Sequence, residues 1–273
     1  MKNITFFCLT LEPNHENTIK DLSFIPVGLG EKRFSENFLS DKSGVNISSK
    51  NSFYGEYTFH YWVWKNYLDK IETDWVGFCQ YRKFFLKDLS EQKNFNYQEF
   101  KKSIINQSSL LDKNYDCILG KKFSVQNYKI SKIVKNHFFE FVTNPKMLLD
   151  KKKRNLKFHF DLFHGKGNLN KAIDLLDEDN KSDFDNFMKK NNSFNPHNMF
   201  ICRTKILKNY YNVIFPWLEK CENIFGFDMH GTYGLKRIYG FLAERFLSYW
   251  FSKNYNVKEH SIIVKNISDY KNL

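Results

Sequence analysis

The chain of 273 residues lacks the sequence features of several large protein classes. Its 5 cysteines are scattered without a Cys-x-x-Cys pair, which argues against a disulfide scaffold and indicates a reducing compartment. It has no secretory signal pattern and no uncharged apolar run of about 18 residues that could cross a membrane. We therefore expect a cytoplasmic protein, at most peripheral at the inner face of the cytoplasmic membrane.

The motifs of nucleic-acid-binding proteins are absent as well. The sequence contains no zinc-finger spacing, no RNP-type motif and no basic region joined to heptads, so we expect no nucleic-acid partner. Its 42 Lys and Arg against 30 Asp and Glu nevertheless give a net charge of +12, which suits a nucleotide diphosphate or an anionic membrane. The densest basic stretch, Lys151–Arg154 with Lys157, is typical of a solvated helix end, or of a contact with acidic lipid headgroups.

Aromatic residues are abundant. They make up 18% of the chain, with 29 Phe and 15 Tyr, within a hydrophobic fraction of 42% that is enough for a substantial core. This aromatic content exceeds what a typical core requires. Either some rings line a binding surface, or the excess follows from AT-rich codons, which favour Phe and Tyr together with Lys, Asn and Ile.

Short apolar runs and helical periodicity alternate along the chain, which predicts a single α/β domain over residues 1–273. The predicted strands are Ile4–Leu9, Ile25–Leu29, Asp74–Tyr81, Tyr115–Leu119 and Met199–Cys202. The predicted helices are Ser52–Ile71, Tyr128–Val142, Asn170–Asp177, Ile206–Phe225 and Lys236–Lys253. We expect a twisted, mostly parallel sheet flanked by helices, with a helical carboxyl-terminal part.

Three blocks crowd aromatic rings against polar side chains. They are Asn46–Asn66, Val76–Phe85, and the pair Asn195–Arg203 with Gly240–Phe246. Such a mixture can stack a ring and hold phosphates or hydroxyls, and α/β folds bind ligands in the loops at the carboxyl ends of their strands. The blocks therefore predict a site for a nucleoside-diphosphate sugar.

The second block places Gln80, Tyr81, Arg82 and Lys83 at the carboxyl end of a buried strand. Many glycosyltransferases of the A-type fold hold a divalent metal there with Asp-x-Asp, and no such motif follows Trp75–Cys79. We therefore expect no metal or other cofactor, with the side-chain charge of Arg82 taking the metal's place, because a guanidinium binds phosphate oxygens bidentately.

Lys83 or Lys50 is expected to assist Arg82. The alternative is a structural ion pair between Arg82 and an acid such as Glu56.

Four further residues are assigned to the donor on local grounds. Asn46, Lys50 and Asn51 precede the predicted helix, where backbone N–H groups favour phosphate, and Asn51 or Ser52 is the expected helix cap. Gly28 belongs to a Gly-x-Gly turn, which is weak evidence for phosphate binding.

Glu244 is the first candidate for the catalytic base, since it lies between Gly240 and Ser248 on one helix face. Asp228, in the polar loop before that helix, is the second candidate. For Glu244, the alternative to a role as catalytic base is an ion pair with Arg245 or Arg237.

His197 and Asn198 are candidates for hydrogen bonds to sugar hydroxyls, and Arg245 is placed with them on the acceptor side. The alternative for His197 is a loop residue without a role in binding. The spacing His159-x-Asp161-x-x-His164 does not put both imidazoles on one helix face, which argues against a metal site.

Taken together, the blocks resemble the bacterial domain-of-unknown-function 4422 family, found among capsule and lipopolysaccharide glycosyltransferases, from about Ile25 to Trp250. The segments that carry the resemblance are Ile25–Gly28, Asp41 with Gly44 and Asn46–Ser48, Lys50-Asn51, Tyr54–Glu56, Tyr61-Trp62, Trp64–Asn66, Gly77, Tyr81-Arg82, Asn198–Ile201, Gly240–Leu242 and Glu244-Arg245. Gln80 departs from the usual His, and residues Lys135–Gly167 look like an insertion or a divergent acceptor region.

The resemblance implies transfer of a sugar, in some members galactofuranose, onto a growing capsular polysaccharide or lipopolysaccharide. We expect the A-type fold, with residues 1–120 holding the nucleotide sugar, residues 121–195 forming a variable acceptor side and residues 196–273 completing the site. The expected partners are a nucleoside-diphosphate sugar and a glycan or lipid-linked glycan acceptor. A non-catalytic module that binds carbohydrate or a membrane surface is the alternative.

Overall fold

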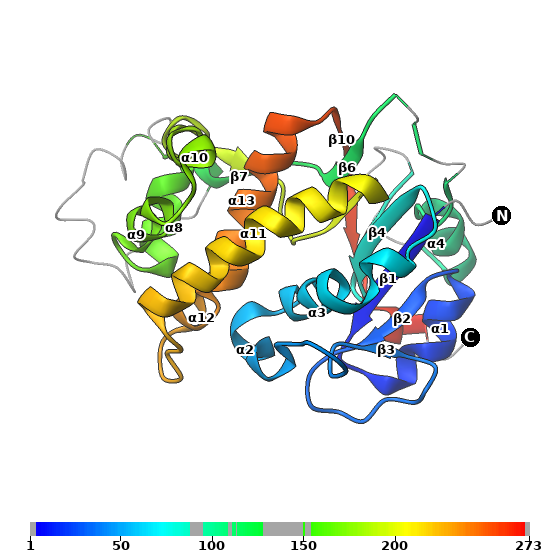
Figure 1. Ribbon diagram of the computed structural model, residues 1–273. Coiled ribbons are helices and arrows are strands. Elements are labelled where there is room, and N and C mark those ends of the chain that lie inside the picture. Colours follow the sequence, from blue (N-terminus) through cyan, green and yellow to red (C-terminus); the bar gives the residue numbers. More distant parts are fainter. Residues whose placement is uncertain are drawn as a thin grey trace.

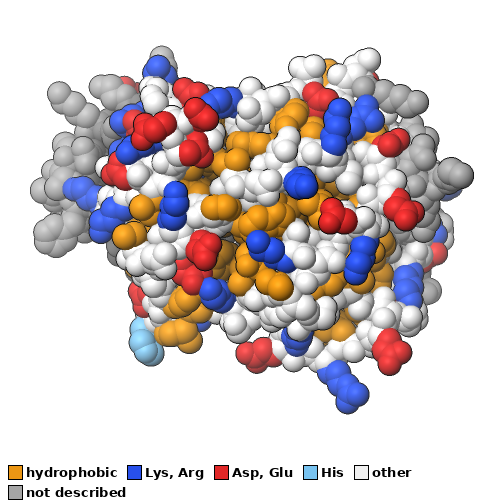
Figure 2. All heavy atoms as spheres, viewed as in Figure 1, with side chains coloured by type: hydrophobic (Ala, Val, Ile, Leu, Met, Phe, Trp, Pro, Cys, Tyr) orange, Lys and Arg blue, Asp and Glu red, His pale blue; other side chains and the backbone are white. Residues whose placement is uncertain are grey.

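The computed structural model describes residues 4–87, 95–108, 111–112, 114–127, 150 and 154–270. Two predictions lie outside these ranges: the helix Tyr128–Val142 and most of the basic stretch, Lys151–Lys153. In the described ranges no helix is both long and apolar enough to span a bilayer. The face shown in Figure 2 carries Lys and Arg side chains dispersed among acidic ones, so the net charge of +12 is not gathered into one patch there.

A central sheet forms the body of the molecule (Figure 1). Its strands lie in the order β10 (Val257–His260), β6 (Cys117–Gly120), β9 (Phe200–Arg203), β4 (Trp75–Gln80), β1 (Ile4–Thr10), β2 (Ile25–Gly28) and β3 (Leu39–Ser40). At one end β5 (Lys83–Phe85) turns back to pair antiparallel with β4, and it also pairs with β11 (Ile262–Val264). A separate pair consists of β7 (Phe123–Ser124) and β8 (Ser193–Phe194).

Most neighbouring strands of the main path run parallel. β1 pairs in parallel with β2 and β4, β2 with β3, and β10 with β6, whereas β9 is antiparallel to both β4 and β6. Leu9 pairs with Gln80 and Thr10 with Gly28, so the carboxyl ends of β1, β2 and β4 meet at one edge. This arrangement confirms the predicted α/β class with a mostly parallel sheet.

The sheet separates two apolar cores. Along β1, Phe7 and Leu9 face one core while Phe6 and Cys8 face the other, as the two-residue period of a strand requires. Both faces are covered, which explains why β1, β4 and β6 read as continuous apolar runs. All 5 cysteines are buried free thiols, as their apolar surroundings predicted.

Helices cover the sheet and extend beyond it (Figure 1). The long helices α11 (Thr204–Phe225) and α13 (Ile238–Asn254) pack against each other and lie between the sheet and a group formed by α8 (Leu156–His164), α9 (Asn168–Asp174) and α10 (Glu178–Lys190). The described residues also form the α-helices α1 (Glu16–Asp21), α2 (Asn51–Tyr54), α3 (Tyr57–Trp62), α4 (Tyr97–Ser103) and α12 (Tyr233–Lys236).

The helix predicted over Ser52–Ile71 is interrupted. α2 ends at Tyr54, and Gly55 adopts a φ of 60° before α3 begins. A Cβ at Gly55 would collide with the Arg237 guanidinium, so the glycine permits both the break and this close approach. The expected cap is also wrong: the Asn51 side chain donates instead to the Gly55 carbonyl and to the Thr58 hydroxyl.

Candidate active site

A cavity of about 280 Å³ opens where the carboxyl ends of β1 and β4 meet the start of α13. Parallel strands bring loops from distant parts of the chain to this one edge. Its polar and aromatic lining is Thr10, Asn51, Glu56, Gln80, Tyr81, Arg82, Lys83, His197, Asn198, Tyr233, Arg237, Phe241 and Glu244. Residues from each of the three aromatic-polar blocks therefore line one cavity, which we call the first cavity.

A tight corner presents the two predicted cations. β4 ends at Gln80 and β5 begins at Lys83, and these two residues pair, so Tyr81 and Arg82 form the turn between them. Arg82 is exposed, with its guanidinium 5.6 Å from the centre of the Tyr81 ring. Lys83 is half-buried. The corner thus places an exposed and a more enclosed cation at the same strand end.

Both cations are left out of the ion pairs that the described residues form. Within the part of the chain that the structure describes, Arg82 and Lys83 form no ion pair. Glu56, the suggested partner of Arg82, pairs with Arg237 instead, at 3.6 Å. Burial lowers the pKa of Lys83, while the carboxylates of Glu56 and Glu244 act in the opposite direction. Two cations therefore remain available to a bound anion.

The loop before β9 is held in an unusual conformation. His197 and Asn198 have φ values of 82° and 53°, both in the left-handed region that non-glycine residues seldom adopt. Gln80 Nε2 donates to the His197 carbonyl at 3.2 Å. Asn198 Nδ2 donates to Glu56 Oε1 at 2.9 Å and to the Gly240 carbonyl at 3.1 Å. Such strain is typical of functional sites, where surrounding contacts fix it.

His197 lines the first cavity, and its backbone carbonyl and N–H are bonded to Gln80 and Glu244. Burial lowers its pKa to about 4, and the nearby charges of Lys83 and Arg82 add to the effect. The ring is therefore neutral at pH 7. A neutral imidazole can both donate and accept hydrogen bonds, as recognition of a hydroxyl requires.

Glu244 lines the first cavity and is oriented from two sides. One carboxylate oxygen accepts from the His197 backbone N–H at 2.6 Å, and the other pairs with the guanidinium of Arg245. Arg245 is only 2% exposed and lies over the Phe194 ring at 3.6 Å. The ion pair with Arg245 that was the alternative interpretation is thus present, and it holds the carboxylate at the cavity wall.

Two predicted donor residues, Gly28 and Asn46, lie outside the first cavity. Gly28 provides room for the ring of Phe34, which a Cβ at this position would meet. Asn46 bonds within its own loop, to the Gly44 carbonyl and to Ser48. Their roles in donor binding stay predictions.

Two predicted residues of opposite charge also lie away from the first cavity. Lys50 pairs with Glu222 at 2.5 Å, so its charge is already neutralised. Asp228 accepts from the backbone N–H groups of His230 and Gly231 in an exposed turn. Asp228 as a catalytic base stays a prediction, one that its position does not favour.

Several residues that line the cavity are not among the predicted catalytic, donor or acceptor residues. Glu56 and Arg237 supply an ion pair in its wall, and Tyr233 and Phe241 supply rings. Glu56 was hidden within an apparently continuous helix. The signal that could have revealed it is Gly55, because a glycine inside a helical pattern often marks a break.

Both carboxylates of the first cavity already have arginine partners. They are Glu56 and Glu244, and Lys83 stands near both. Among the described residues no group of three His, Cys, Asp or Glu side chains gathers in metal-binding geometry. Asp-x-Asp spacings occur only on α10, away from the cavity lining, where Asp177 caps the helix, Asp183 pairs with Lys253 and Asp185 with Lys189.

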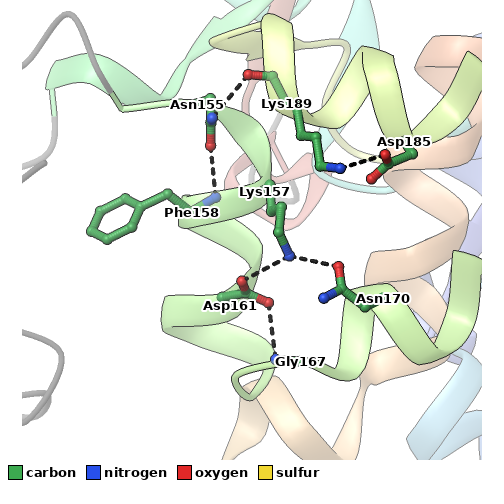
Figure 3. Close-up of polar contacts among 8 residues, drawn as sticks. All are labelled: Asn155, Lys157, Phe158, Asp161, Gly167, Asn170, Asp185 and Lys189. Atoms are coloured by element: carbon green, nitrogen blue, oxygen red, sulfur yellow. Dashed lines mark hydrogen bonds and ion pairs between the residues drawn. The ribbon is translucent and has the colours of Figure 1, made fainter. Parts of the chain in front are cut away.

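In the spacing His159-x-Asp161-x-x-His164, the carboxylate of Asp161 is engaged in hydrogen bonds within the outer helices. As Figure 3 shows, Asp161 accepts from Lys157 Nζ and from the backbone N–H of Gly167, so its carboxylate ties α8 to the turn before α9. Lys157 also donates to Asn170 at 2.7 Å. These contacts are structural.

The sequence profile of the family described as a domain of unknown function (DUF4422) matches residues 12–255. The chain belongs to this family. Among solved structures, the apo structure of the WbbM bifunctional glycosyltransferase is similar, with a TM-score of 0.62 and 22% sequence identity. The match covers 96% of this chain and 45% of WbbM, so the chain spans about half the length of that protein. No curated protein matches the chain.

Proposed function

We propose that this protein is a glycosyltransferase that moves a sugar from a nucleoside-diphosphate sugar to a glycan acceptor. The observation that carries the proposal is the pair Arg82 and Lys83, which reach a cavity at the carboxyl end of β4 without an ion pair among the described residues. A half-buried ammonium without a partner is costly unless an anion joins it. The similarity in fold to WbbM, named a glycosyltransferase, supports the same class.

The charges of the cavity wall suit a diphosphate. The wall holds three cations, Arg82, Lys83 and Arg237, and two carboxylates, Glu56 and Glu244. Arg237 is paired with Glu56, and Glu244 with Arg245 from outside this cavity. Arg82 and Lys83 are left to stabilise the negative charge that develops on the diphosphate as its bond to the sugar breaks. The half of the protein proposed to hold the nucleotide sugar would thus act without a metal ion.

Glu244 is the proposed base. As the acceptor oxygen forms its bond to the anomeric carbon, its proton passes to the Glu244 carboxylate, and the electron pair of the breaking C–O bond leaves with the diphosphate. Each carboxylate oxygen has two lone pairs, so the bonds to His197 and Arg245 leave capacity for this proton. Glu56, bonded to Asn198 in the same wall, is the other carboxylate within the cavity.

The family membership supports a more specific assignment. We propose that the acceptor is a growing capsular polysaccharide or lipopolysaccharide and that the transferred sugar is galactofuranose or another hexose. Residues before 121 would hold the nucleotide, because the β1 and β4 ends belong to them, and later residues would hold the acceptor. His197, Asn198 and Arg245 are the proposed contacts on the acceptor side.

Calorimetric titration with UDP, GDP, CDP and dTDP tests the donor site. We expect at least one nucleotide to bind, and the double change Arg82→Ala with Lys83→Ala to weaken it at least about tenfold, since each cation makes charge-assisted bonds to phosphate. Lys253→Ala is the matched control, because this lysine is paired with Asp183 and does not line the cavity. Equal binding by the double variant, or none by the wild type, would overturn the proposal.

A further inference from the structure

A second cavity of about 840 Å³ lies beside the first. Four residues line both: His197, Tyr233, Phe241 and Glu244. Most of the remaining wall of the second cavity comes from β7, β8, α8 and α12. The two cavities therefore meet at Glu244, the carboxylate proposed as the base.

The lining of the second cavity is mostly aromatic. Phe123 comes from β7, Phe163 from α8, Phe194 from β8 and Phe241 from α13, and Tyr233 stands at its edge, 69% exposed. The His164 ring stacks on Phe241 with 4.1 Å between ring centres. Rings from four separate elements thus surround one space whose size falls within the roughly 300–1,000 Å³ usual for small-molecule sites.

The second cavity also differs from the first in charge. Its charged lining residues among those described are Glu244 and Arg245, which neutralise each other. Burial lowers the pKa of His159 to about 2 and that of His164 to about 3, so both imidazoles are neutral at pH 7. A diphosphate would find no unpaired cation here. An uncharged ligand with apolar faces fits better.

Polar groups in the wall can meet hydroxyls. His164 Nδ1 lies 3.1 Å from the Gly234 carbonyl, which only accepts, so this nitrogen carries the proton and Nε2 of the neutral ring is an acceptor. Thr232 adds a hydroxyl and His197 a second neutral imidazole. Rings that stack on C–H faces and a few neutral hydrogen-bonding groups are the combination that recognises a sugar.

We propose that the second cavity is the acceptor subsite and binds an uncharged saccharide whose rings stack on Phe163 and Phe241, with one hydroxyl directed to Glu244. This inference rests on the proposed function and adds the class of acceptor, a neutral glycan. It also assigns a specificity role to Phe163, which lines the second cavity and not the first.

Saturation-transfer NMR on the full chain, with UDP and GDP present, tests the subsite. The neutral probes are di- or trisaccharides built from galactose, glucose, mannose, rhamnose or N-acetylglucosamine. Trigalacturonic acid is the charged counterpart. We expect transfer to the ring C–H protons of at least one neutral probe and none to trigalacturonic acid. Phe163→Ala should reduce the signal about fivefold and Phe163→Trp should retain it, because stacking needs a ring.

Phe227→Ala is the matched control, since this phenylalanine is 39% exposed and lines neither cavity. Calorimetry on the same samples should show unchanged nucleotide affinity for both alanine variants. Nucleotide binding without transfer to any neutral probe, or an undiminished signal in Phe163→Ala, would overturn the acceptor subsite alone. Failure of all nucleotides to bind would overturn the proposed function instead.

Discussion

The Glu244 carboxylate accepts a hydrogen bond of 2.6 Å from the backbone N–H of His197, a residue with a φ of 82°. The left-handed turn is therefore tied directly to the proposed base. The same turn is bonded to Gln80 at the end of β4, next to the Arg82 and Lys83 corner. One strained loop thus fixes the distance between the groups proposed for the leaving diphosphate and for the acceptor proton.

Replacing the base tests its role most directly. Glu244→Gln keeps the side-chain shape and an oxygen that can accept from His197, but it cannot take a proton. We expect kcat for transfer to fall about 100-fold or more, with little change in donor affinity, since general base catalysis contributes on this scale. Steady-state kinetics with the donor found by titration would measure both.

Glu222→Gln is the control for Glu244→Gln, because Glu222 pairs with Lys50 outside the cavity and should leave kcat unchanged. A Glu244→Gln enzyme that turns over normally, or that has lost only donor affinity, would remove Glu244 from the role of base. Glu56, the other carboxylate of the wall, would then be the next residue to replace.

The strained turn yields a prediction about stability. Asn198→Ala removes the hydrogen bonds to Glu56 and Gly240 and puts a less tolerant residue at a φ of 53°. We expect a loss of about 3 kcal/mol in the free energy of unfolding, whereas Asn198→Gly should lose about 2 kcal/mol, because glycine adopts this φ freely. Urea denaturation measures the difference. Equal losses would show that backbone strain does not matter here.

The corner Gln80 to Lys83 was predictable from sequence for a simple reason. A run buried on both faces can only be a central strand, and the polar residues that follow it must lie at its carboxyl end. The loop position of His197 was predictable as well, since a proline between polar residues precedes the apolar run Met199–Cys202. Local composition therefore placed residues from three segments in one cavity.

Pairings between distant residues were not predictable in the same way. Lys50 was assigned to the donor because it precedes a helix, yet it bonds to Glu222, 172 residues away. Nothing near Lys50 in the sequence indicates that partner. Likewise, the contact of Glu56 with Arg237 depends on how α2 packs against α13, which no local pattern encodes.

Buried histidines predict a fall in stability at acid pH. Burial lowers the pKa of His60 and His164 to about 3 and that of His159 to about 2, from an ordinary value near 6.5. Between pH 6.5 and pH 4 the unfolded chain takes up a proton at each site and the folded protein does not, so acid favours unfolding. Each histidine adds a slope of up to about 1.4 kcal/mol per pH unit.

Urea denaturation from pH 7 to pH 5 should therefore show a falling free energy of unfolding. His60→Phe is an informative variant, because His60 lies among Phe78, Phe200 and Tyr211, where a phenyl ring fits. The variant loses the hydrogen bond to Tyr211 at every pH but should show a shallower pH slope than the wild type. A wild-type stability that is constant over this range would contradict the neutral, buried state of these rings.

Metal dependence gives the last prediction. The cavity offers Arg82 and Lys83 where a metal-dependent enzyme would offer free carboxylates, and both of its carboxylates are paired with arginine. A dication placed there would meet these cations at close range and would be repelled. We therefore expect transfer activity to survive EDTA and to gain less than about twofold from added Mn²⁺ or Mg²⁺. Titrating EDTA and then Mn²⁺ into a transfer assay measures the metal dependence. If EDTA eliminates the activity and Mn²⁺ restores it, a metal, rather than the Tyr81–Lys83 corner, stabilises the departing diphosphate.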